Sequence, residues 1–427
     1  MAAPDKVFSL EGRLLKLDTA QDLEAHIGPL RAMDDVEEIR ILGNTLGVEA
    51  CKLLGEVLAT KKSLKVANLA DIFTGRLLNE IPEALSSLLT SILNLPNLRT
   101  INLNDNAFGL NTQAPLVAFL SSHIPLQHLY LNNNGLGPHA GVLIADALSE
   151  LHAKKEEARK AGQEVPYLET VICGRNRLEN GSMLAWAKAF SLHNRVKEVK
   201  LVQNGIRQEG IEQLLTLGLN HATELKVIDL QDNTFTAQGA KALAKVVSLW
   251  GDIQDLGVGD SLLSARGGIY LAKALSQGRN RRLEILRLQY NDITSAGVKG
   301  LAAAVRDGLP ALRRIELNGN RFSEDDESIL ALQNLLRERK KGRGGGGDAA
   351  GDEDSWGVDS LSDLEDVDSE EEEAEEEEEE EDEEGVTPAE RAEKLVREAE
   401  EAQEEPTAQR KDAEVDELAK KLEKTGI

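Results

Sequence analysis

The sequence contains little of what holds secreted or membrane proteins together. Its 427 residues include 2 cysteines and 3% aromatic residues. Cys51 and Cys173 lie far apart and indicate no disulfide framework, so we expect a reducing compartment. The N-terminal MAAPDKVFSLEGR has no apolar core of signal-peptide length, and no run approaches the ~18 apolar residues of a membrane span. We therefore expect no membrane partner.

The signatures of nucleotide and metal chemistry are also missing. No GxxxxGK[ST] occurs, so the chain has no P-loop with which to bind a nucleotide itself. The 7 histidines and 2 cysteines show no metal-ligand spacing. His123, His128 and His139 lie close in sequence without a Ser or Cys nucleophile signature, and we expect them on the surface. We therefore expect no cofactor or metal of its own.

Basic charge is absent from one segment and balanced by acidic charge elsewhere. The net charge is −26. Between Asp352 and Glu384 the chain has about 22 acidic side chains and no basic ones, and such blocks usually stay disordered. Residues 1–351 are consequently close to neutral. Because phosphate contacts need a basic face, we expect no nucleic-acid partner.

The sequence is instead rich in copies of one pattern, L-x-x-L-x-L-x-x-N-x-L. It reads LQHLYLNNNGL from Leu126, and most copies lie about 28 to 30 residues apart, as in long leucine-rich repeats. An Ala- and Leu-rich segment with apolar spacings of three and four follows each copy and predicts a helix. Further full copies begin at Val36, Leu98, Leu168, Val196, Leu225, Leu283 and Leu312, and degenerate copies at Leu64 and Ile253.

One strand plus one helix cannot bury both of its faces, so such units stack. We predict an α/β leucine-rich repeat horseshoe over residues 1–340, similar to ribonuclease inhibitor, with about ten to eleven repeats, an N-terminal cap, a parallel inner sheet and outer helices. The charged insertion between 134 and 176 predicts an extended helix and loop. Residues 341–386 have the composition of a Gly-rich linker and a disordered acidic segment. Residues 387–427 form a charged, partly helical tail, beginning with a capping box at Thr387.

The three consecutive asparagines at 132–134 are expected to have different roles. Asn134 occupies the repeat position where the strand leaves the sheet, and its carboxamide can satisfy backbone donors and acceptors there. We predict a ladder that includes its counterparts at 44, 106, 176, 204, 233, 291 and 320. Asn133 has no such role, because Gly, Asp, Arg, Gln and Tyr replace it in other repeats. It is either a solvated turn residue on the rim or a functional group, and Asn132 receives no role.

Several segments resemble one known family. ADIFTGR, DNAFG, LYLNNNGLGP, CGRNRLENGSM, LQDNTFT, LLSARG and ELNGNRFSE, followed by an acidic tail, are similar in order and spacing to the Ran GTPase-activating proteins in their fungal form, over roughly residues 8 to 327. DIFTGR is the most specific element. There Ile72 replaces the ladder asparagine, and local rules tend to be broken at functional sites.

The resemblance implies a partner and a mechanism. The partner is Ran-GTP, and Ran itself binds the GTP and the magnesium ion. Many GTPase activators insert an arginine finger, whereas this family does not. A rim asparagine, Asn133 here, presses on Ran's own catalytic glutamine and holds it against the attacking water. The chain would then be an activator, with hydrolysis carried out by Ran in nucleocytoplasmic transport.

Further interface residues are expected near the rim. The resemblance implies that Arg76 supports the interface outside the nucleotide site; the alternative is a structural arginine that caps a helix or pairs with Asp71 or Glu80. Four charged residues lie at or next to positions equivalent to Asn133 and are either partner-binding residues or inert surface charges. They are Asp105, Arg175, Arg177 and Asp232.

One alternative function and the role of the tail stay open. The alternative is a non-catalytic leucine-rich repeat module that binds or inhibits another protein, and only DIFTGR and Asn133 argue against it. The acidic tail either solubilises the chain or attracts a basic partner. Ser360, Ser362 and Ser369 each have an acid three places on, a pattern for acid-directed phosphorylation. The tail is too short for the domain that attaches vertebrate relatives to the nuclear pore. We expect a cytoplasmic monomer, which an accessory Ran-binding protein could join on Ran.

Overall fold

The computed structural model describes residues 4–342 and 355–365, which belong to one compact unit, Met1–Glu383. A second unit, Glu384–Ile427, lies outside the described residues, together with the tail helix expected from Thr387. The first unit is built on a 12-stranded sheet whose strands pair in parallel and nearly in chain order. Its strands are β1 (Val7–Ser9), β3 (Glu38–Arg40), β5 (Val66–Asn68), β6 (Thr100–Asn102), β7 (His128–Tyr130), β8 (Thr170–Ile172), β9 (Glu198–Lys200), β10 (Val227–Asp229), β11 (Asp255–Gly257), β12 (Ile285–Arg287), β13 (Arg314–Glu316) and β14 (Gly357–Val358).

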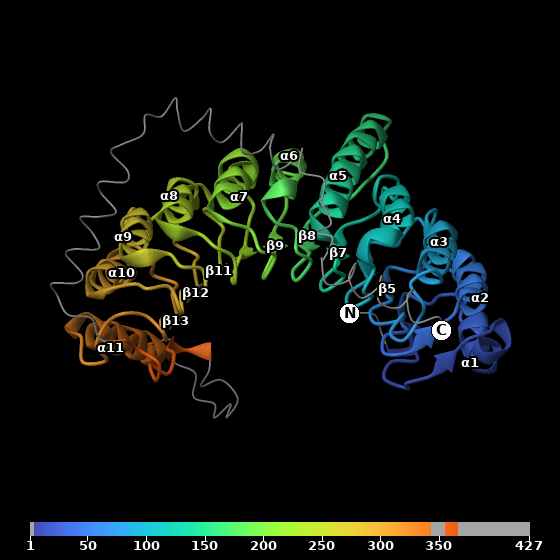
Figure 1. Cartoon of the computed structure of the whole chain (residues 1–427), viewed down its shortest axis with the longest axis horizontal. Coiled ribbons are helices and arrows are strands. Elements are labelled where there is room, and N and C mark those ends of the chain that lie inside the picture. The colour runs from blue at the N-terminus through green and yellow to red at the C-terminus, as the bar shows by residue number, and fades with distance from the viewer. Residues whose placement is uncertain (1–3, 343–354, 366–427) are drawn as a thin grey trace, which may run out of the picture. The chain divides into compact units, whose positions relative to one another are not determined.

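Helices connect the strands and lie on the outer side of the sheet within this unit (Figure 1). A short strand pair, β2 (Lys16–Leu17) with β4 (Thr45–Leu46), accompanies the N-terminal repeats. The predicted α/β leucine-rich repeat solenoid is confirmed. The helices are α1 (Ala20–Ala32), α2 (Val48–Ala59), α3 (Ile81–Ile92), α4 (Gln113–Leu120), α5 (Gly137–Lys160), α6 (Met183–Leu192), α7 (Gln208–Gln213), α8 (Thr236–Val246), α9 (Ser264–Leu275), α10 (Ser295–Asp307) and α11 (Glu327–Gly342).

The strand pattern explains why each repeat folds in this way. In β7, Leu129 is buried between the half-buried His128 and Tyr130, because side chains alternate between the two faces of a strand. The leucines on either side of the strand, Leu126 and Leu131, are also fully buried. Strand register matches equivalent residues in neighbouring repeats, so the apolar side chains form one continuous core between sheet and helices.

The asparagine ladder is confirmed. The Nδ2 group of Asn134 donates to the carbonyl oxygens of Leu103 and Leu131, both at 3.0 Å. Its Oδ1 accepts the backbone N–H of Asn106 at 2.9 Å, and its own N–H reaches Oδ1 of Asn176 at 2.9 Å. All eight ladder asparagines are buried. Each carboxamide therefore satisfies backbone groups that the end of the strand would leave unpaired in the core.

Asn132, which received no role from the sequence, also builds the fold. Its Oδ1 accepts the N–H of Gly174 at 2.6 Å. Its own N–H donates to Oδ1 of Asn104 at 2.7 Å. These bonds link three adjacent repeats at the point where the strands end. Of the three consecutive asparagines, two are therefore committed to the fold.

The insertion between the repeats at 134 and 176 is an extended helix and a loop, as predicted. Helix α5 has 24 residues, the longest among the described elements. Lys155 lies in α5 and is buried. Its ammonium donates to the carbonyl oxygens of Ile124 (2.7 Å), Leu126 (2.6 Å) and Pro166 (2.8 Å). Burial lowers the pKa of Lys155 to about 7, while the three carbonyls stabilise its protonated form. This side chain ties the insertion to the neighbouring repeat.

The C-terminal boundary differs from the prediction. Residues 355–365, expected in the disordered acidic segment, contain strand β14, which pairs with β13 at the end of the sheet. The Asp359 carboxylate accepts the N–H groups of Leu317 (2.7 Å) and Asn318 (3.1 Å). The N–H of Glu365 donates to the carbonyl oxygen of Asn320 at 3.0 Å. The acidic segment thus supplies hydrogen-bond partners for backbone groups of the last repeat, which the next repeat would otherwise provide. Amino-acid composition alone could not predict this contact.

Other sequence expectations have mixed outcomes. Cys51 and Cys173 are both buried, and burial raises the pKa of each thiol to about 12, which leaves them unreactive. His139 is exposed as expected and His128 is half-buried. The surface assignment was wrong for His123, which is fully buried with its ring nitrogens 2.8 and 2.7 Å from two backbone carbonyl oxygens. No helix in residues 4–342 or 355–365 is both long and apolar enough to cross a membrane.

Candidate partner-binding groove on the rim

Asn133 lies in a backbone conformation that recurs in each repeat. Its φ is +54°, in the left-handed region that L-residues rarely adopt. The residue before the ladder position has a positive φ in all ten repeats, so the turn itself requires this conformation and projects each side chain onto the same rim. The equivalent residues are Gly43, Asp71, Asp105, Arg175, Gln203, Asp232, Asp260, Tyr290 and Gly319.

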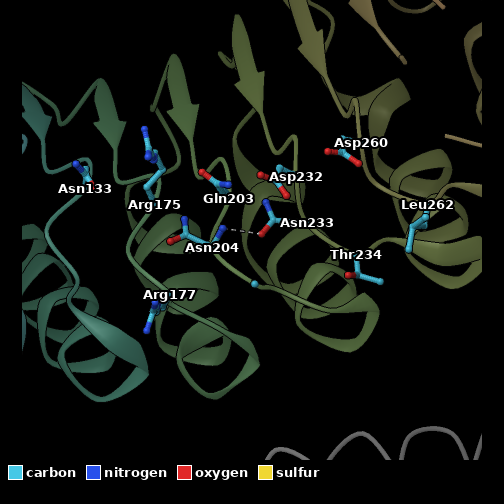
Figure 2. A pocket seen from close by; sticks show the side chains of 11 residues that line it. Asn133, Arg175, Arg177, Gln203, Asn204, Asp232, Asn233, Thr234, Asp260 and Leu262 are labelled. Carbon is cyan, nitrogen blue, oxygen red and sulfur yellow. Dashed lines mark hydrogen bonds between the residues drawn. The ribbon is translucent and has the colours of Figure 1, made fainter. Parts of the chain in front are cut away.

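Some of these side chains line an open groove of about 620 Å³. The structure brings four of the predicted site residues together there: Asn133, Arg175, Arg177 and Asp232. Figure 2 shows Asn133 and Arg175 as neighbours on adjacent turns at one end, and Asp232 beyond Gln203. The remaining lining residues are Gln203, Asn204, Gly205, Asn233, Thr234, Asp260 and Leu262.

The groove has opposite charges at its two ends. Arg175 and Arg177 are exposed beside Asn133. Asp232 and Asp260 lie several turns away, and partial burial together with the Asp260 charge raises the pKa of Asp232. Leu262 adds an apolar side chain that is 53% exposed. The predicted mixed-sign rim is therefore present, and it suits a partner surface with both signs of charge.

Asn133 itself is exposed, and none of its side-chain atoms is committed to the ladder. Its backbone N–H donates to the carbonyl oxygen of Gly174 at 2.9 Å, which fixes the Cα. Its Nδ2 donates to Oδ1 of Asp105 at 2.9 Å. Asp105, also a predicted site residue, lies outside the groove lining and contacts it through this bond. None of the hydrogen bonds among the described residues involves the side-chain oxygen of Asn133.

Arg76 is held elsewhere by internal contacts. Its guanidinium pairs with the Asp18 carboxylate at 2.6 Å and donates to the hydroxyl and carbonyl oxygens of Thr45 at 2.9 and 3.0 Å. Its side chain is 9% exposed, and the arginine lowers the pKa of Asp18. The alternative partners, Asp71 and Glu80, do not make this contact. Arg76 therefore fastens the DIFTGR loop to the N-terminal repeats, and a role at the interface stays a prediction.

Sequence reasoning missed several groove residues that the repeat itself could have identified. Gln203 and Asp260 occupy the same repeat position as Asn133. Thr234 and Leu262 each directly follow a ladder position, as the predicted Arg177 does. The groove therefore combines two rows of residues, one from each side of the ladder, with the ladder residues Asn204 and Asn233 between them (Figure 2). Applying both offsets would have identified all of the lining except the ladder residues Asn204 and Asn233.

The groove suits recognition of a protein rather than a small molecule. Its outer row covers five consecutive repeats, from Asn133 to Asp260, which at a strand spacing of ~4.8 Å corresponds to about 20 Å. Small-molecule sites are mostly apolar and enclose their ligand, whereas this groove is open and polar. Within the part of the chain that the structure describes, no three potential metal-ligating side chains cluster.

The stacked repeats define a leucine-rich repeat protein with an open, polar groove on its rim. The family model described as "Leucine Rich repeat" matches residues 221–244 and 279–302.

Two relatives define the family more closely. Ran GTPase-activating protein 1 of Saccharomyces cerevisiae is 38% identical over 337 residues, which cover 77% of this chain and 82% of the yeast protein. Ran GTPase-activating protein 1 of Xenopus laevis is 42% identical over 205 residues, or 47% of this chain and 35% of the frog protein. The chain belongs to the Ran GTPase-activating protein family.

A weaker similarity connects the chain to a different functional class. The ribonuclease inhibitor of Sus scrofa is 24% identical over 72% of this chain and 63% of its own length. The identity is much lower than for the yeast protein over a similar share of the chain. The common part is the repeat architecture.

Proposed function

We propose that this chain activates GTP hydrolysis by Ran. The observation that carries the proposal is the 38% identity over 77% of the chain to a yeast protein of that name. The open, mixed-charge groove provides a surface of the kind that a folded protein partner would contact. In this proposal Ran binds GTP and magnesium and performs the hydrolysis, while this chain contributes side chains to Ran's active site.

Asn133 is the residue that we propose to act on the nucleotide site. A glutamine side chain of Ran has several rotamers, and fixing the productive one moves an ordering cost out of the transition state. A tenfold gain in rate needs about 1.4 kcal/mol, and five decades need about 6.8 kcal/mol. One immobilised side chain cannot supply the larger value. Ordering of Ran's loops and exclusion of water from the closed complex would supply the remainder.

An arginine finger is the competing mechanism. Arg76 is a weak candidate, because its guanidinium is occupied by Asp18 and Thr45. Arg175 and Arg177 are stronger candidates, since both are exposed in the groove beside Asn133. A finger would be lost in arginine-to-lysine variants, because lysine cannot reproduce the planar guanidinium contacts. We assign these two arginines to binding, so that their substitution should raise the half-saturating concentration more than it lowers the maximal rate.

The deciding experiment is single-turnover GTP hydrolysis by Ran with and without the full chain, repeated with several other small GTPases. We expect the chain to accelerate GTP hydrolysis by Ran and by none of the other GTPases. Binding to a protein without acceleration of any GTPase would favour the second function, a non-catalytic binder like the ribonuclease inhibitors. Acceleration that survives in Asn133→Ala and is abolished in Arg175→Lys or Arg177→Lys would replace the asparagine mechanism with a finger.

The setting of the activity is also a proposal. We propose a monomer in the cytoplasm that uses no cofactor of its own and takes part in nucleocytoplasmic transport. A Ran-binding accessory protein could join the complex on another face of Ran. Gel filtration with light scattering would test the monomer, and fluorescence microscopy of the tagged chain would test its location.

A further inference from the structure

The contact between Asn133 and Asp105 differs from the ladder contacts because it joins two exposed side chains on the rim. Both residues occupy left-handed rim positions of adjacent repeats, with φ values of +54° and +60°. Both are exposed, yet Nδ2 of Asn133 lies 2.9 Å from Oδ1 of Asp105. The two side chains come from residues 28 positions apart, one repeat length, so the stacking of the turns places them together.

An ionised carboxylate can only accept hydrogen bonds, whereas a carboxamide has a donor end and an acceptor end. If the carboxamide of Asn133 rotated by half a turn, its oxygen would face the oxygen of Asp105, which is repulsive. Asp105 therefore selects the orientation in which Nδ2 faces Asp105 and Oδ1 faces away from it. Because the acceptor is charged, this bond is stronger than one between two neutral groups.

We propose that Asp105 is a positioning residue that presents Oδ1 of Asn133, as a hydrogen-bond acceptor, to the side-chain NH₂ of Ran's catalytic glutamine. That glutamine would donate one N–H to Asn133 and keep its own oxygen for the attacking water. The inference rests on the proposed function and deepens it: it assigns an atom of Asn133 to the contact and gives Asp105 a role other than direct binding. No covalent step involves either residue.

The arrangement also accounts for the choice of asparagine at this rim position. Asparagine and aspartate tolerate the left-handed conformation better than most residues. An asparagine offers a neutral acceptor that a neighbouring carboxylate can orient. Another aspartate at 133 would face Asp105 with like charge, and its carboxylate would be strongly hydrated.

The test compares Asp105→Asn in two backgrounds, wild type and Asn133→Ala, as a double-mutant cycle. Asparagine at 105 keeps the size and the left-handed conformation, but it can face Asn133 with either end and so no longer selects one orientation. Asp105→Gly, which suits the positive φ and removes the carboxylate altogether, guards against misfolding of any one variant. Asp325→Asn removes the same charge from an exposed loop residue and serves as the control.

At saturating concentrations of the chain, we expect Asp105→Asn to lower the single-turnover rate on Ran-GTP about twofold, because the productive orientation of the Asn133 carboxamide falls from nearly all molecules to about half of them. We expect the half-saturating concentration to stay unchanged, and Asp325→Asn to change neither value. In the Asn133→Ala background, Asp105→Asn should have no further effect. A rise in half-saturating concentration that is equal in both backgrounds would make Asp105 a direct contact to Ran and overturn the proposal. An unchanged rate would overturn it as well.

A measurement without Ran separates this inference from the proposed function. In the full chain labelled with ¹⁵N-asparagine, the side-chain NH₂ resonances of Asn133 are identified by their loss in Asn133→Ala. We expect Asp105→Asn and Asp105→Gly to shift them and Asp325→Asn to leave them in place. If the wild-type chain accelerates no GTPase, the proposed function fails, and the role in activation fails with it even where these shifts occur. If the wild type is active and the resonances stay in place, the positioning role alone is rejected.

Discussion

Asn133 and Asn134 are adjacent asparagines, but the side chain of one is exposed on the rim and that of the other is buried in the fold. Asn134 is fully buried, and its carboxamide satisfies backbone groups of two adjacent repeats. Asn133 is exposed on the rim, and its side chain contacts only another rim side chain among the bonds described, at Asp105. The pair shows that a residue's contribution follows from which side of a turn it occupies rather than from its chemistry alone.

The reason lies in the backbone between them. The left-handed turn at Asn133 rotates its side chain out to the rim, and the next residue points into the solenoid. Each repeat makes this turn, so each repeat has one inward position that the fold requires and one outward position that it leaves free. The outward row can therefore vary and acquire function while the inward row stays asparagine, serine or, at the DIFTGR repeat, Ile72.

The largest effect should come from removing the outward carboxamide. We predict that Asn133→Ala and Asn133→Gly lower the maximal rate of Ran-GTP hydrolysis about 100-fold, the lower end for loss of one preorganised polar group in an active site. The half-saturating concentration should change little. Because alanine in a left-handed turn carries its own strain, Asn133→Gly is the matched control for backbone effects. A glycine variant with wild-type turnover would remove Asn133 from the mechanism.

The inward carboxamide should show the reverse behaviour. We predict that Asn134→Ala lowers the free energy of unfolding by about 1 to 3 kcal/mol, because it leaves buried backbone groups without partners. The maximal rate, measured well below the unfolding transition and per folded molecule, should stay near wild type. Urea denaturation followed by circular dichroism gives the stability. An unchanged midpoint would contradict the ladder assignment.

The end of the ladder offers a third test. A chain that ends at residue 351 lacks β14 and the Asp359 carboxylate that accepts from Leu317 and Asn318, whereas a chain that ends at residue 366 keeps both. We predict that the shorter chain is less stable by about 1 to 2 kcal/mol, the cost of a few lost hydrogen bonds. Both chains should keep full activity at saturating Ran. Equal melting temperatures for the two chains would reduce β14 to an incidental contact.

The smallest effect should come from an outward position away from Asn133. We predict that Gln203→Gly changes the free energy of unfolding by less than about 1 kcal/mol, because glycine relieves the left-handed strain while adding chain entropy to the unfolded state. The adjacent inward change, Asn204→Ala, should cost about 1 to 3 kcal/mol. Thermal denaturation of the two variants compares them directly. Equal losses of unfolding free energy in both variants would contradict the distinction between inward and outward positions.

Much of the fold and part of the site could be predicted from the sequence. The repeat pattern predicted the strands and the ladder. The position directly before each ladder residue predicted Asn133, Arg175 and Asp232 as rim residues, and these three line one groove. The internal partners of Arg76 could not be predicted, because Asp18 belongs to the N-terminal cap, where the repeat pattern gives no register. His123 was predicted to be a surface residue because the carbonyl oxygens that contact it belong to Leu93 and Leu98, 30 and 25 residues earlier in the chain.

By itself, the sequence determined the periodic features: the stacked α/β architecture, the buried asparagines, and which positions the fold leaves free. These follow from local patterns, since a repeated strand and helix can bury their apolar faces only against copies of themselves. The tertiary structure alone decided which distant residues meet: the carboxylate that accepts from Asn133, the ion pair that occupies Arg76, and the strand β14 that pairs with the last repeat. Such contacts depend on the direction in which each turn projects its side chain, and that direction exists only after the repeats have stacked.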